Sequence, residues 1–350
     1  MSEPNTALST ARSTLMNALF GTIVTQAVGL AARMELADAI GTGERHVDDL
    51  AARYGIPADR LNRLLRALAC MRLCDEPRPG AFRLTEAGAL LRGDHPHSRL
   101  ALAKLLTDRA MQDAWLHLET SVRTGRTAFD EVFGMPVFEY LARNPELSAT
   151  FNLAMSQRTK GDGVTDTLPD HYDFSRFTAV TDVGGGDGTL LTAVLRRHTA
   201  LEGTVFDTAE GVAQATLTLD AADLGGRCKV VAGDFFESVP GGSDLQMIKS
   251  VLHNWDDDRA VEILGHCREV LPDHGRLLII EPILPERVDP EDESLEDPYL
   301  SDLNMMLLIG GRERTLADFT ALCERAGLSV TDVIELPRHV DFGVIEAKPA

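Results

Sequence analysis

The sequence has few cysteines and lacks a long apolar run, a secretory start and any excess of basic charge. Its five cysteines are an odd number without disulfide or zinc spacing, which predicts free and mostly buried thiols at Cys70, Cys74, Cys228, Cys267 and Cys323. No run of eighteen apolar residues occurs, so no transmembrane helix is expected. The first residues have neither the charged start nor the apolar core of a signal peptide. We therefore expect a cytoplasmic protein.

The charge and the length set two further limits. The net charge is −20, and such a surface repels phosphate, so general attraction to nucleic acid or to an anionic membrane is not expected. Apolar residues make up 44% and charged residues 25% of the chain, as in ordinary soluble globular proteins. A chain of 350 residues is long enough for two buried cores. The patterns below divide it into domains at 1–105 and 106–350.

The first domain is predicted to be mostly helical. Residues from about 14 to 105 show short helical patterns, among them "HVDDLAARYG" and "PADRLNRLLRALACM". The segment "FRLTEAGALL" predicts a short strand that leads into a helix, and this order is typical of a winged helix. A DNA-binding regulator is therefore one rival interpretation, since Arg60, Arg63 and Arg66 fall on one helical face. The charge of the whole chain favours a solvated face instead.

From about residue 177 strands alternate with helices, which predicts a parallel sheet covered on both faces. The expected strands are "FTAVTDV", "EGTVFD", "CKVVAGDFF", "DLQMIKSVL" and "RLLIIEPI", and the expected helices include "TLLTAVLRRH" and "DRAVEILGHCREVL". The last two strands, "LSVTDVIEL" and "HVDFGVIEA", have no helix between them and predict an antiparallel hairpin on an otherwise parallel sheet. The acidic segment Glu286–Pro298 is interpreted as a solvated loop.

A glycine-rich turn lies between the first strand of this sheet and its helix, in "VTDVGGGDGTLL". Glycines let a backbone approach a ligand closely, and the helix N-terminus offers free N–H groups to an anion. A dinucleotide fingerprint that starts at Gly184 would need glycine at Thr189, and Gly188 comes one residue too early. The spacing, with Asp182 before it, suits a carboxylate and an amine better than a pyrophosphate.

Acidic and aromatic residues follow the next two strands. Asp207 ends the second strand, where an acid can accept both hydroxyls of a ribose. After the third strand, Asp234 could accept from an adenine amino group and Phe235 could lie against the ring. Each acid taken alone could equally be a loop or cap residue. In this order, the three signals favour a nucleoside that also carries an amino acid, namely S-adenosylmethionine.

A histidine follows the fourth strand, in "VLHNWDDDRA". His253 could simply end the strand and form a local hydrogen bond, and for an isolated histidine that is the ordinary explanation. Ligands of open parallel sheets bind outside the carboxyl ends of the strands, which favours a functional role here. A metal site would need other ligands, whereas Asp256, Asp257 and Asp258 are better explained by the dipole of the next helix. No metal is expected.

Several of these segments together resemble one family. "DVGGGDG", "GTVFD", "GDFFESVP", "VLHNWDDDRAVEIL", "RLLIIEPILP" and "GGRERTLADF" are similar to motifs of the S-adenosylmethionine-dependent small-molecule O-methyltransferases, which include plant phenolic methyltransferases and bacterial tailoring enzymes of antibiotic and polyketide pathways. The resemblance covers nearly the whole chain. It implies a Rossmann-like class I methyltransferase sheet behind a winged-helix-like domain. It also implies a homodimer in which the first domain exchanges helices with its partner and lines the active site.

The resemblance also assigns roles. At the cofactor it implies that Gly184, Gly185 and Gly186 form the glycine loop and that Asp207 binds the ribose. It also implies that Asp234, Phe235 and Trp255 surround the adenine and that Lys249 lies beside the cofactor. His253 falls on the general base, with Glu281 and Glu313 as the two acids that hold its imidazole. Plant members usually have aspartate after the histidine, but this chain has Asn254, which can orient a substrate without a charge.

The expected activity is metal-independent transfer of a methyl group to a hydroxyl of an aromatic or quinone natural product, with S-adenosylhomocysteine as the second product. The candidates for lining the substrate site are Met155, Asn304 and Met305, although methionine is more often plain core filler. Some proteins that resemble this family keep the fold and the cofactor but perform hydroxylation or decarboxylation. The histidine with its two candidate acids favours methyl transfer.

Overall fold

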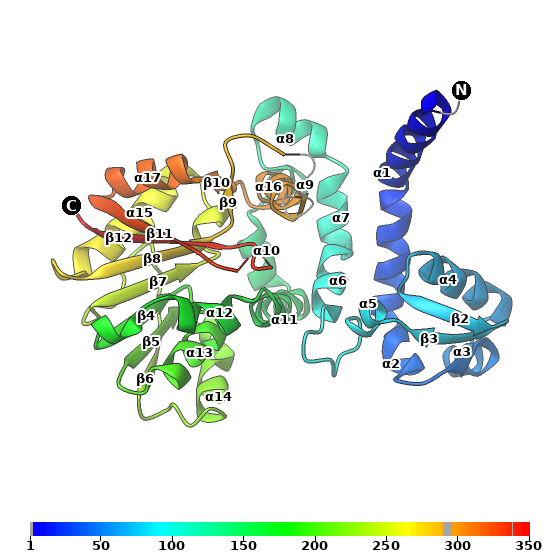
Figure 1. Ribbon diagram of the computed structural model, residues 1–350, viewed down its shortest axis with the longest axis horizontal. Helices are drawn as coiled ribbons and strands as arrows, with labels where there is room; N and C mark the ends of the chain where they lie inside the picture. The colour runs from blue at the N-terminus through cyan, green and yellow to red at the C-terminus, as the bar shows by residue number, and fades with distance from the viewer. Residues whose placement is uncertain (1–2, 290–295, 338) are drawn as a thin grey trace. The chain divides into compact units, whose positions relative to one another are not determined.

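The computed structural model of the chain describes residues 3–289, 296–337 and 339–350 (Figure 1). It divides into two units, Met1–Gln112 and Asp113–Ala350. The division lies beyond the boundary predicted after residue 105. Residues beyond α6 (Leu100–Leu106) also bind α1 (Glu3–Arg33), since Arg33 donates to Thr107 and Gln26 donates to Gln112, so they belong to the first unit. Each unit is described by itself below.

The first unit begins with one long helix, whereas the sequence patterns predicted only short ones. The 31-residue α1 (Glu3–Arg33) is rich in alanine and leucine, and no proline follows until Pro57, so nothing stops the helix before Glu35 adopts a left-handed conformation with φ 51°. By length and composition alone, Ser9–Arg33 could cross a membrane. Its apolar residues are interspersed with threonine, serine and glycine, which is why no continuous apolar run marked it.

The rest of the first unit has the predicted winged-helix order. Its helices and strands are α2 (Leu36–Ile40), β1 (Arg45–His46), α3 (Val47–Tyr54), α4 (Ala58–Cys70), β2 (Cys74–Arg78), β3 (Ala81–Leu84), α5 (Glu86–Ala89) and α6 (Leu100–Leu106). The strands pair antiparallel in the order β1-β3-β2. Helix α4 buries Leu61, Leu65 and Leu68 against Phe82 of β3, which fixes the helical layer on this small sheet.

The second unit starts with a helical segment that leads into a seven-stranded sheet. The helices are α7 (Arg109–Trp115), which crosses the division, α8 (Leu118–Thr124), α9 (Ala128–Phe133), α10 (Val137–Arg143), α11 (Pro145–Gly161), α12 (Val164–His171) and the single turn η1 (Phe174–Arg176). The strands are β4 (Ala179–Val183), β5 (Glu202–Asp207), β6 (Cys228–Ala232), β7 (Leu245–Lys249), β8 (Arg276–Glu281), β11 (Leu328–Glu335) and β12 (Gly343–Pro349).

The sheet confirms the predicted mixed arrangement. Its order is β11-β12-β8-β7-β4-β5-β6. The central strands β8, β7, β4, β5 and β6 pair in parallel, and β12 joins β8 antiparallel with β11 at the edge. Two short strands, β9 (Ile283–Leu284) and β10 (Arg314–Thr315), pair separately in parallel.

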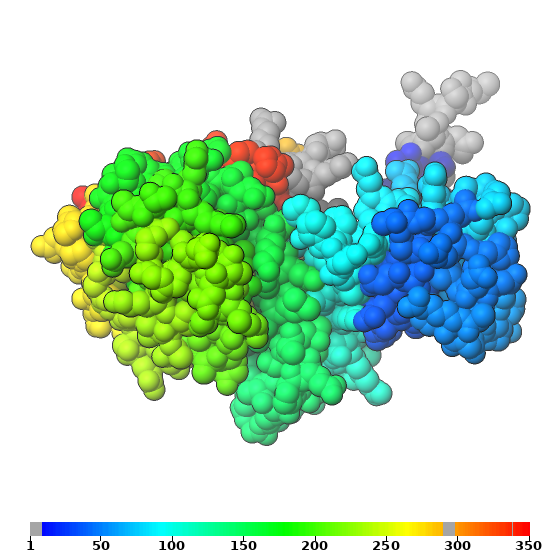
Figure 2. Space-filling model, turned by 90° about the horizontal axis from the view of Figure 1, so that it is seen from below, coloured from blue at the N-terminus to red at the C-terminus, as the bar shows by residue number. Residues whose placement is uncertain are grey.

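Helices cover the sheet and enclose two apolar cores. One core includes Leu168 of α12 and Leu191 and Leu195 of α13 (Thr189–Arg197). Figure 2 shows α12, α13 and the helix after β5, in green to yellow-green, closing over the second unit from this side. The other core holds Ile263 of α15 (Asp257–Val270) and Phe319 of α17 (Leu316–Arg325). The remaining elements of this unit are η2 (Gly211–Gln214), α14 (Ala215–Asp220), η3 (Leu252–Asn254), α15 (Asp257–Val270), α16 (Glu296–Leu308) and α17 (Leu316–Arg325).

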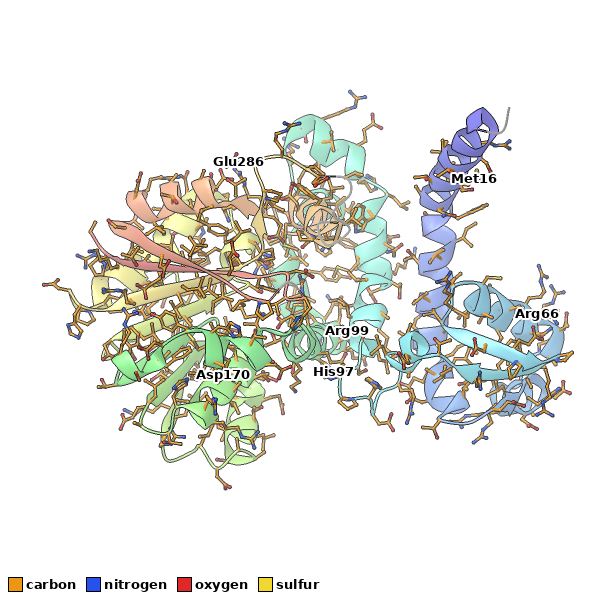
Figure 3. The ribbon with its side chains drawn as sticks, viewed as in Figure 1. Met16, Arg66, His97, Arg99, Asp170 and Glu286 are labelled. Carbon is orange, nitrogen blue, oxygen red and sulfur yellow. The ribbon has the colours of Figure 1, made fainter. Side chains whose placement is uncertain are left out.

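The acidic segment predicted as a loop is only partly described. Residues 290–295 lie outside the described residues, and α16 begins at Glu296. The end of the segment is therefore helical rather than a loop. Glu286 lies before the gap (Figure 3).

Candidate active site

The predicted base lies in a tight turn directly after β7. His253 belongs to the one-turn helix η3 and is 5% exposed. Its Nδ1 lies 3.0 Å from Oε1 of Glu313 and 3.8 Å from Oε2 of Glu281. An ionised carboxylate only accepts hydrogen bonds, so an ionised Glu313 places the proton on Nδ1. No described residue binds Nε2, which is thus the nitrogen left to act as a base.

The two acids are placed differently. Glu281 ends β8, is fully buried, and accepts hydrogen bonds from the backbone N–H groups of Val251 (3.0 Å) and Leu252 (2.9 Å) through one oxygen. Glu313 accepts from the imidazole and, at 2.8 Å, from the Ser301 hydroxyl. Glu313 is therefore the direct partner of His253, and Glu281 mainly fixes the backbone before the histidine.

The charges of the three groups shift their pKa values in different directions. Burial alone would lower the pKa of His253, but the charge of Glu281 and the hydrogen bond to Glu313 raise it above 6.5 on balance. Burial would raise the pKa of Glu313, yet the hydrogen bond from His253 and its charge bring it below its usual value. Burial dominates for Glu281 and raises its pKa. Together the acids stabilise a protonated imidazole.

A buried arginine, which the sequence reasoning missed, holds the histidine turn in shape. Arg314 is completely buried and donates to the backbone oxygens of Leu252 and Trp255, both at 2.8 Å, and to Asp257. The N–H of Arg312 donates to the backbone oxygen of His253 at 2.9 Å. The segment after α16 therefore binds the turn through hydrogen bonds to the backbone oxygens of the turn. The only sequence signal for Arg314 was that it lies within "GGRERTLADF".

The glycine loop lies at the carboxyl ends of β4 and β5, beside the histidine turn. Gly184 has φ 72°, and a Cβ there would lie 2.4 Å from Val251, so only glycine allows this approach. The N–H of Gly186 donates to the Asp207 carboxylate at 3.0 Å. Nothing lies within 4 Å of the position that a Cβ on Gly186 would take.

Asp182, just before the loop, is an unusual carboxyl group. It is 2% exposed, one of its oxygens has no hydrogen-bond partner, and burial raises its pKa to about 7. A buried, unsatisfied carboxyl oxygen at a strand end is unfavourable unless a ligand donates to it. This oxygen, at the residue that the glycine spacing suggested, is therefore a candidate acceptor for a ligand.

The residues predicted near an adenine form an aromatic group. Strand β6 ends at Ala232, earlier than predicted, so Asp234 and Phe235 belong to the following loop. The Phe235 ring lies 6.2 Å from the Trp255 ring, and Phe236 lies 4.6 Å from it. The indole Nε1 of Trp255 is buried without a partner.

Lys249 and Asn254 are already partly engaged. The Nζ of Lys249 lies 2.7 Å from Asp162, which follows α11, and 4.6 Å from the centre of the Phe342 ring. The Asn254 amide donates to the backbone oxygen of Ser250 at 3.2 Å. Asn254 thus keeps its side-chain oxygen for a ligand, whereas Lys249 joins α11 to the end of β7.

The predicted substrate-lining residues come from two helices. Met155 of α11 and Asn304 of α16 are half-buried, whereas Met305 is 6% exposed and packs inside. Helix α16 also supports Glu313, because Asp302 accepts from its backbone N–H at 2.8 Å. The structure thus favours Met155 and Asn304 over Met305 as surfaces open to a ligand.

His253, Glu281 and Glu313 are also spaced so that they could hold a metal ion, since one ligand atom from each lies within 4.8 Å of the others. The pairing of Nδ1 with Glu313 and the two backbone N–H groups on Glu281 account for these contacts as hydrogen bonds.

The chain matches the models of two protein domains. Residues 115–329 match the O-methyltransferase domain, and residues 16–94 match the O-methyltransferase dimerisation domain. The chain is 43% identical to an O-demethylpuromycin-O-methyltransferase of Streptomyces alboniger over 97% of this chain and 89% of that protein. The solved structure of a mitomycin 7-O-methyltransferase superposes with a TM-score of 0.88 at 30% identity, covering 99% of this chain and all of the other.

The chain is also similar to a relative that is named for hydroxylation and not for methyl transfer. The aclacinomycin 10-hydroxylase of Streptomyces purpurascens is 33% identical over 89% of this chain and 83% of its own length. The relatives of this chain therefore include proteins named for two different reactions, O-methylation and hydroxylation.

Proposed function

This chain belongs to the S-adenosylmethionine-dependent O-methyltransferases of secondary metabolism, and from its site we propose that His253 serves as the base when a hydroxyl of an aromatic or quinone natural product is methylated. The observation that carries the proposal is the pairing of Nδ1 with Glu313 at 3.0 Å, because it leaves Nε2 available for a substrate hydroxyl.

The residues at the strand ends fit the cofactor. The unpartnered oxygen of Asp182 can accept from its ammonium group, and the Asp207 carboxylate lies where a ribose can meet it. Asp234, Phe235 and Trp255 would surround the adenine, and the buried Trp255 Nε1 offers a donor there. Gly186 leaves open space for the cofactor, Gly184 and Gly185 let the loop lie close to Val251 and Asp182, and Lys249 is proposed to lie beside the cofactor. When bound, the cofactor supplies an electrophilic methyl group.

Positioning contributes more to this reaction than proton transfer does. A phenol of pKa ~10 facing a histidine of pKa ~6.5 would make full proton transfer uphill by about 5 kcal/mol. The raised pKa of His253 reduces that difference, because the two acids favour the imidazolium that forms. Asn254, Asn304 and Met155 are the proposed surface for the flat substrate, whereas Met305 packs in the interior. No metal is required in this scheme.

Mass spectrometry on the wild type and on His253→Ala would test the proposal. The assay supplies S-adenosylmethionine and a panel of polycyclic phenols and hydroxyquinones. A methylated product formed in step with S-adenosylhomocysteine, and reduced about 10²- to 10⁴-fold in the variant, would support His253 as the base. His274→Ala, at an exposed histidine of the same unit, is the matched control. Undiminished turnover by His253→Ala would rule out this role.

The similarity to a hydroxylase favours a second candidate function, oxygenation of the substrate on the same fold. The same assay separates the two, since an oxygenated product with the cofactor left intact would assign the chain to that reaction. The His253–Glu313 pair is the reason to place methyl transfer first.

We also infer a soluble, cytoplasmic homodimer joined through the first unit, with no nucleic acid or membrane partner. The match to the dimerisation domain over residues 16–94 supports this inference. In such a dimer, the exposed apolar residues Leu15, Leu19 and Ile23 of α1 would pack against the partner subunit and not against a membrane.

A further inference from the structure

Helix α11 presents one face that carries an arginine between two contacts with the site. Phe151, Met155, Arg158 and Asp162 are spaced by four, three and four residues, which places them on one side of a helix. Asp162 still has helical backbone angles, φ −89° and ψ −1°. The face therefore continues from Phe151 to the residue that caps α11.

Both ends of this face are connected to residues that flank His253 in the chain, one end directly and the other through the Phe138 ring. The Phe151 ring lies edge-on to Phe138 at 6.1 Å, and Phe138 stacks on Trp255 at 5.8 Å. At the other end, Asp162 pairs with Lys249 at 2.7 Å. Trp255 and Lys249 lie on either side of the histidine turn in the chain, so Met155 and Arg158, in the middle of the face, lie between its two connections to the residues around that turn.

Arg158 has no partner in the described part of the chain. It is half-buried, yet no carboxylate or carbonyl oxygen within 3–289, 296–337 and 339–350 receives its N–H groups. Two other enclosed arginines of this unit are paired: Arg314 binds two backbone oxygens and Asp257, and Arg227 binds the backbone oxygens of Leu195 and Leu201. The N–H groups of the half-buried Arg158 guanidinium are therefore left for an acceptor that a ligand would supply.

The charge of Arg158 acts on the catalytic pair. For His253, after burial and the two acids, it is a further influence that lowers the pKa; for Glu313 it lowers the pKa after burial, His253 and Ser301. The other nearby cation, Lys249, is already paired with Asp162. Arg158 is thus the cation beside His253 that is still available to an anionic ligand.

We propose that Arg158 binds a carboxylate on the aromatic substrate, close to the hydroxyl that is methylated. The planar guanidinium fork matches a carboxylate with two parallel hydrogen bonds, which a neutral amide or ester in the same place cannot match. The inference deepens the proposed function by naming the substrate class as aromatic hydroxy acids, and it rests on that function.

Calorimetric binding to the enzyme loaded with S-adenosylhomocysteine tests the inference without turnover. The ligands are hydroxybenzoates and hydroxynaphthoates, each paired with its carboxamide. We expect the wild type to bind at least one carboxylate about tenfold or more tightly than its amide. Arg158→Gln should remove that preference while amide binding stays unchanged, and Arg158→Lys should restore part of it. Arg143→Gln, at an exposed arginine paired with Glu139, is the control.

Two results would overturn the inference. One is a wild type without carboxylate preference across the panel, and the other is equal weakening of acid and amide by Arg158→Gln, which would indicate a structural role. Its failure is distinguishable from that of the proposed function, because the methylation assay with neutral phenols does not depend on this preference. An oxygenated product alongside an Arg158-dependent preference would reject only methyl transfer.

Discussion

At the scale of single residues, the two acids of the site, Glu281 and Glu313, have different contacts. Glu313 contacts the imidazole directly, while Glu281 binds two backbone N–H groups and faces Nδ1 from 3.8 Å. The resemblance to known enzymes assigned both acids the same task of holding the imidazole. The geometry instead gives Glu313 the orientation of the imidazole ring and Glu281 the support of the backbone just before His253.

Replacing Glu313 by glutamine should slow methyl transfer and shift its pH dependence. Since His253 must be neutral to accept a proton, wild-type activity should rise with pH through an apparent pKa above 6.5. Glu313→Gln removes a charge that raises this pKa, so the midpoint should move to lower pH and kcat should fall about 10- to 100-fold. Rate–pH profiles of both proteins measure this. An unchanged midpoint would contradict a direct Glu313–His253 pairing.

Glu281 should stabilise the fold through its hydrogen bonds to two backbone N–H groups. Glu281→Gln keeps an oxygen for the N–H groups of Val251 and Leu252, whereas Glu281→Leu leaves both buried groups unpaired. The leucine variant should lose roughly 1–3 kcal/mol of unfolding free energy per unpaired group relative to the glutamine variant. Urea denaturation of the two variants provides the comparison. Equal stabilities would mean that the backbone bonds are not the main role of Glu281.

At the scale of elements, the site forms where segments distant in sequence approach closely. The chain after α16 lies so near the histidine turn that a Cβ on Gly311 would come within 2.0 Å of the backbone oxygen of His253. The same segment contributes Glu313 and the buried Arg314. Its position sets the distance between His253, the proposed base, and Glu313.

Gly311→Ala should therefore impair catalysis more than folding of the rest of the unit. The methyl group must push the segment away from His253, which lengthens the 3.0 Å contact with Glu313. We expect kcat to fall about 10-fold or more, with near-normal far-ultraviolet circular dichroism. Gly265→Ala is the control, because a Cβ there meets nothing within 4 Å. Wild-type kcat in Gly311→Ala would show that the segment can move without cost.

At the scale of the whole molecule, α1 leaves an apolar stripe without cover. Leu15, Leu19 and Ile23 are 60%, 64% and 60% exposed and recur every fourth residue, so they share one face. Figure 3 shows Met16 on the same helix.

The basic face suggested by the rival DNA-binding interpretation is partly neutralised, because Arg66 pairs with Glu76 and Arg60 with Asp59.

Charges on the stripe should separate the predicted homodimer. Leu19→Glu combined with Ile23→Glu keeps good helix formers but places two carboxylates on an apolar surface. We expect light scattering to report a dimer for the wild type and a monomer for the double variant. Leu217→Glu, at a residue 65% exposed in the second unit, should remain dimeric. A dimer in the double variant would exclude α1 as the main interface.

The sequence by itself determined the order of the elements and the residue types at the strand ends. Alternating strands and helices predicted the parallel sheet with its antiparallel hairpin, and the glycine turn and His253 followed strands as expected. These features depend on local periodicity and on where parallel strands end, which neighbouring residues specify. The length of α1 was not predicted, because its apolar residues are interspersed with polar ones.

Only the tertiary structure decided how the site residues divide their work. Glu281, Glu313 and Arg314 come from segments well separated from His253 in sequence, and which oxygen faces Nδ1 depends on how those segments pack. Likewise, the unpartnered oxygen of Asp182 and the unpaired guanidinium of Arg158 become meaningful only when every neighbour is known. Hydrogen bonding and desolvation depend on distances across the fold, which no local pattern encodes.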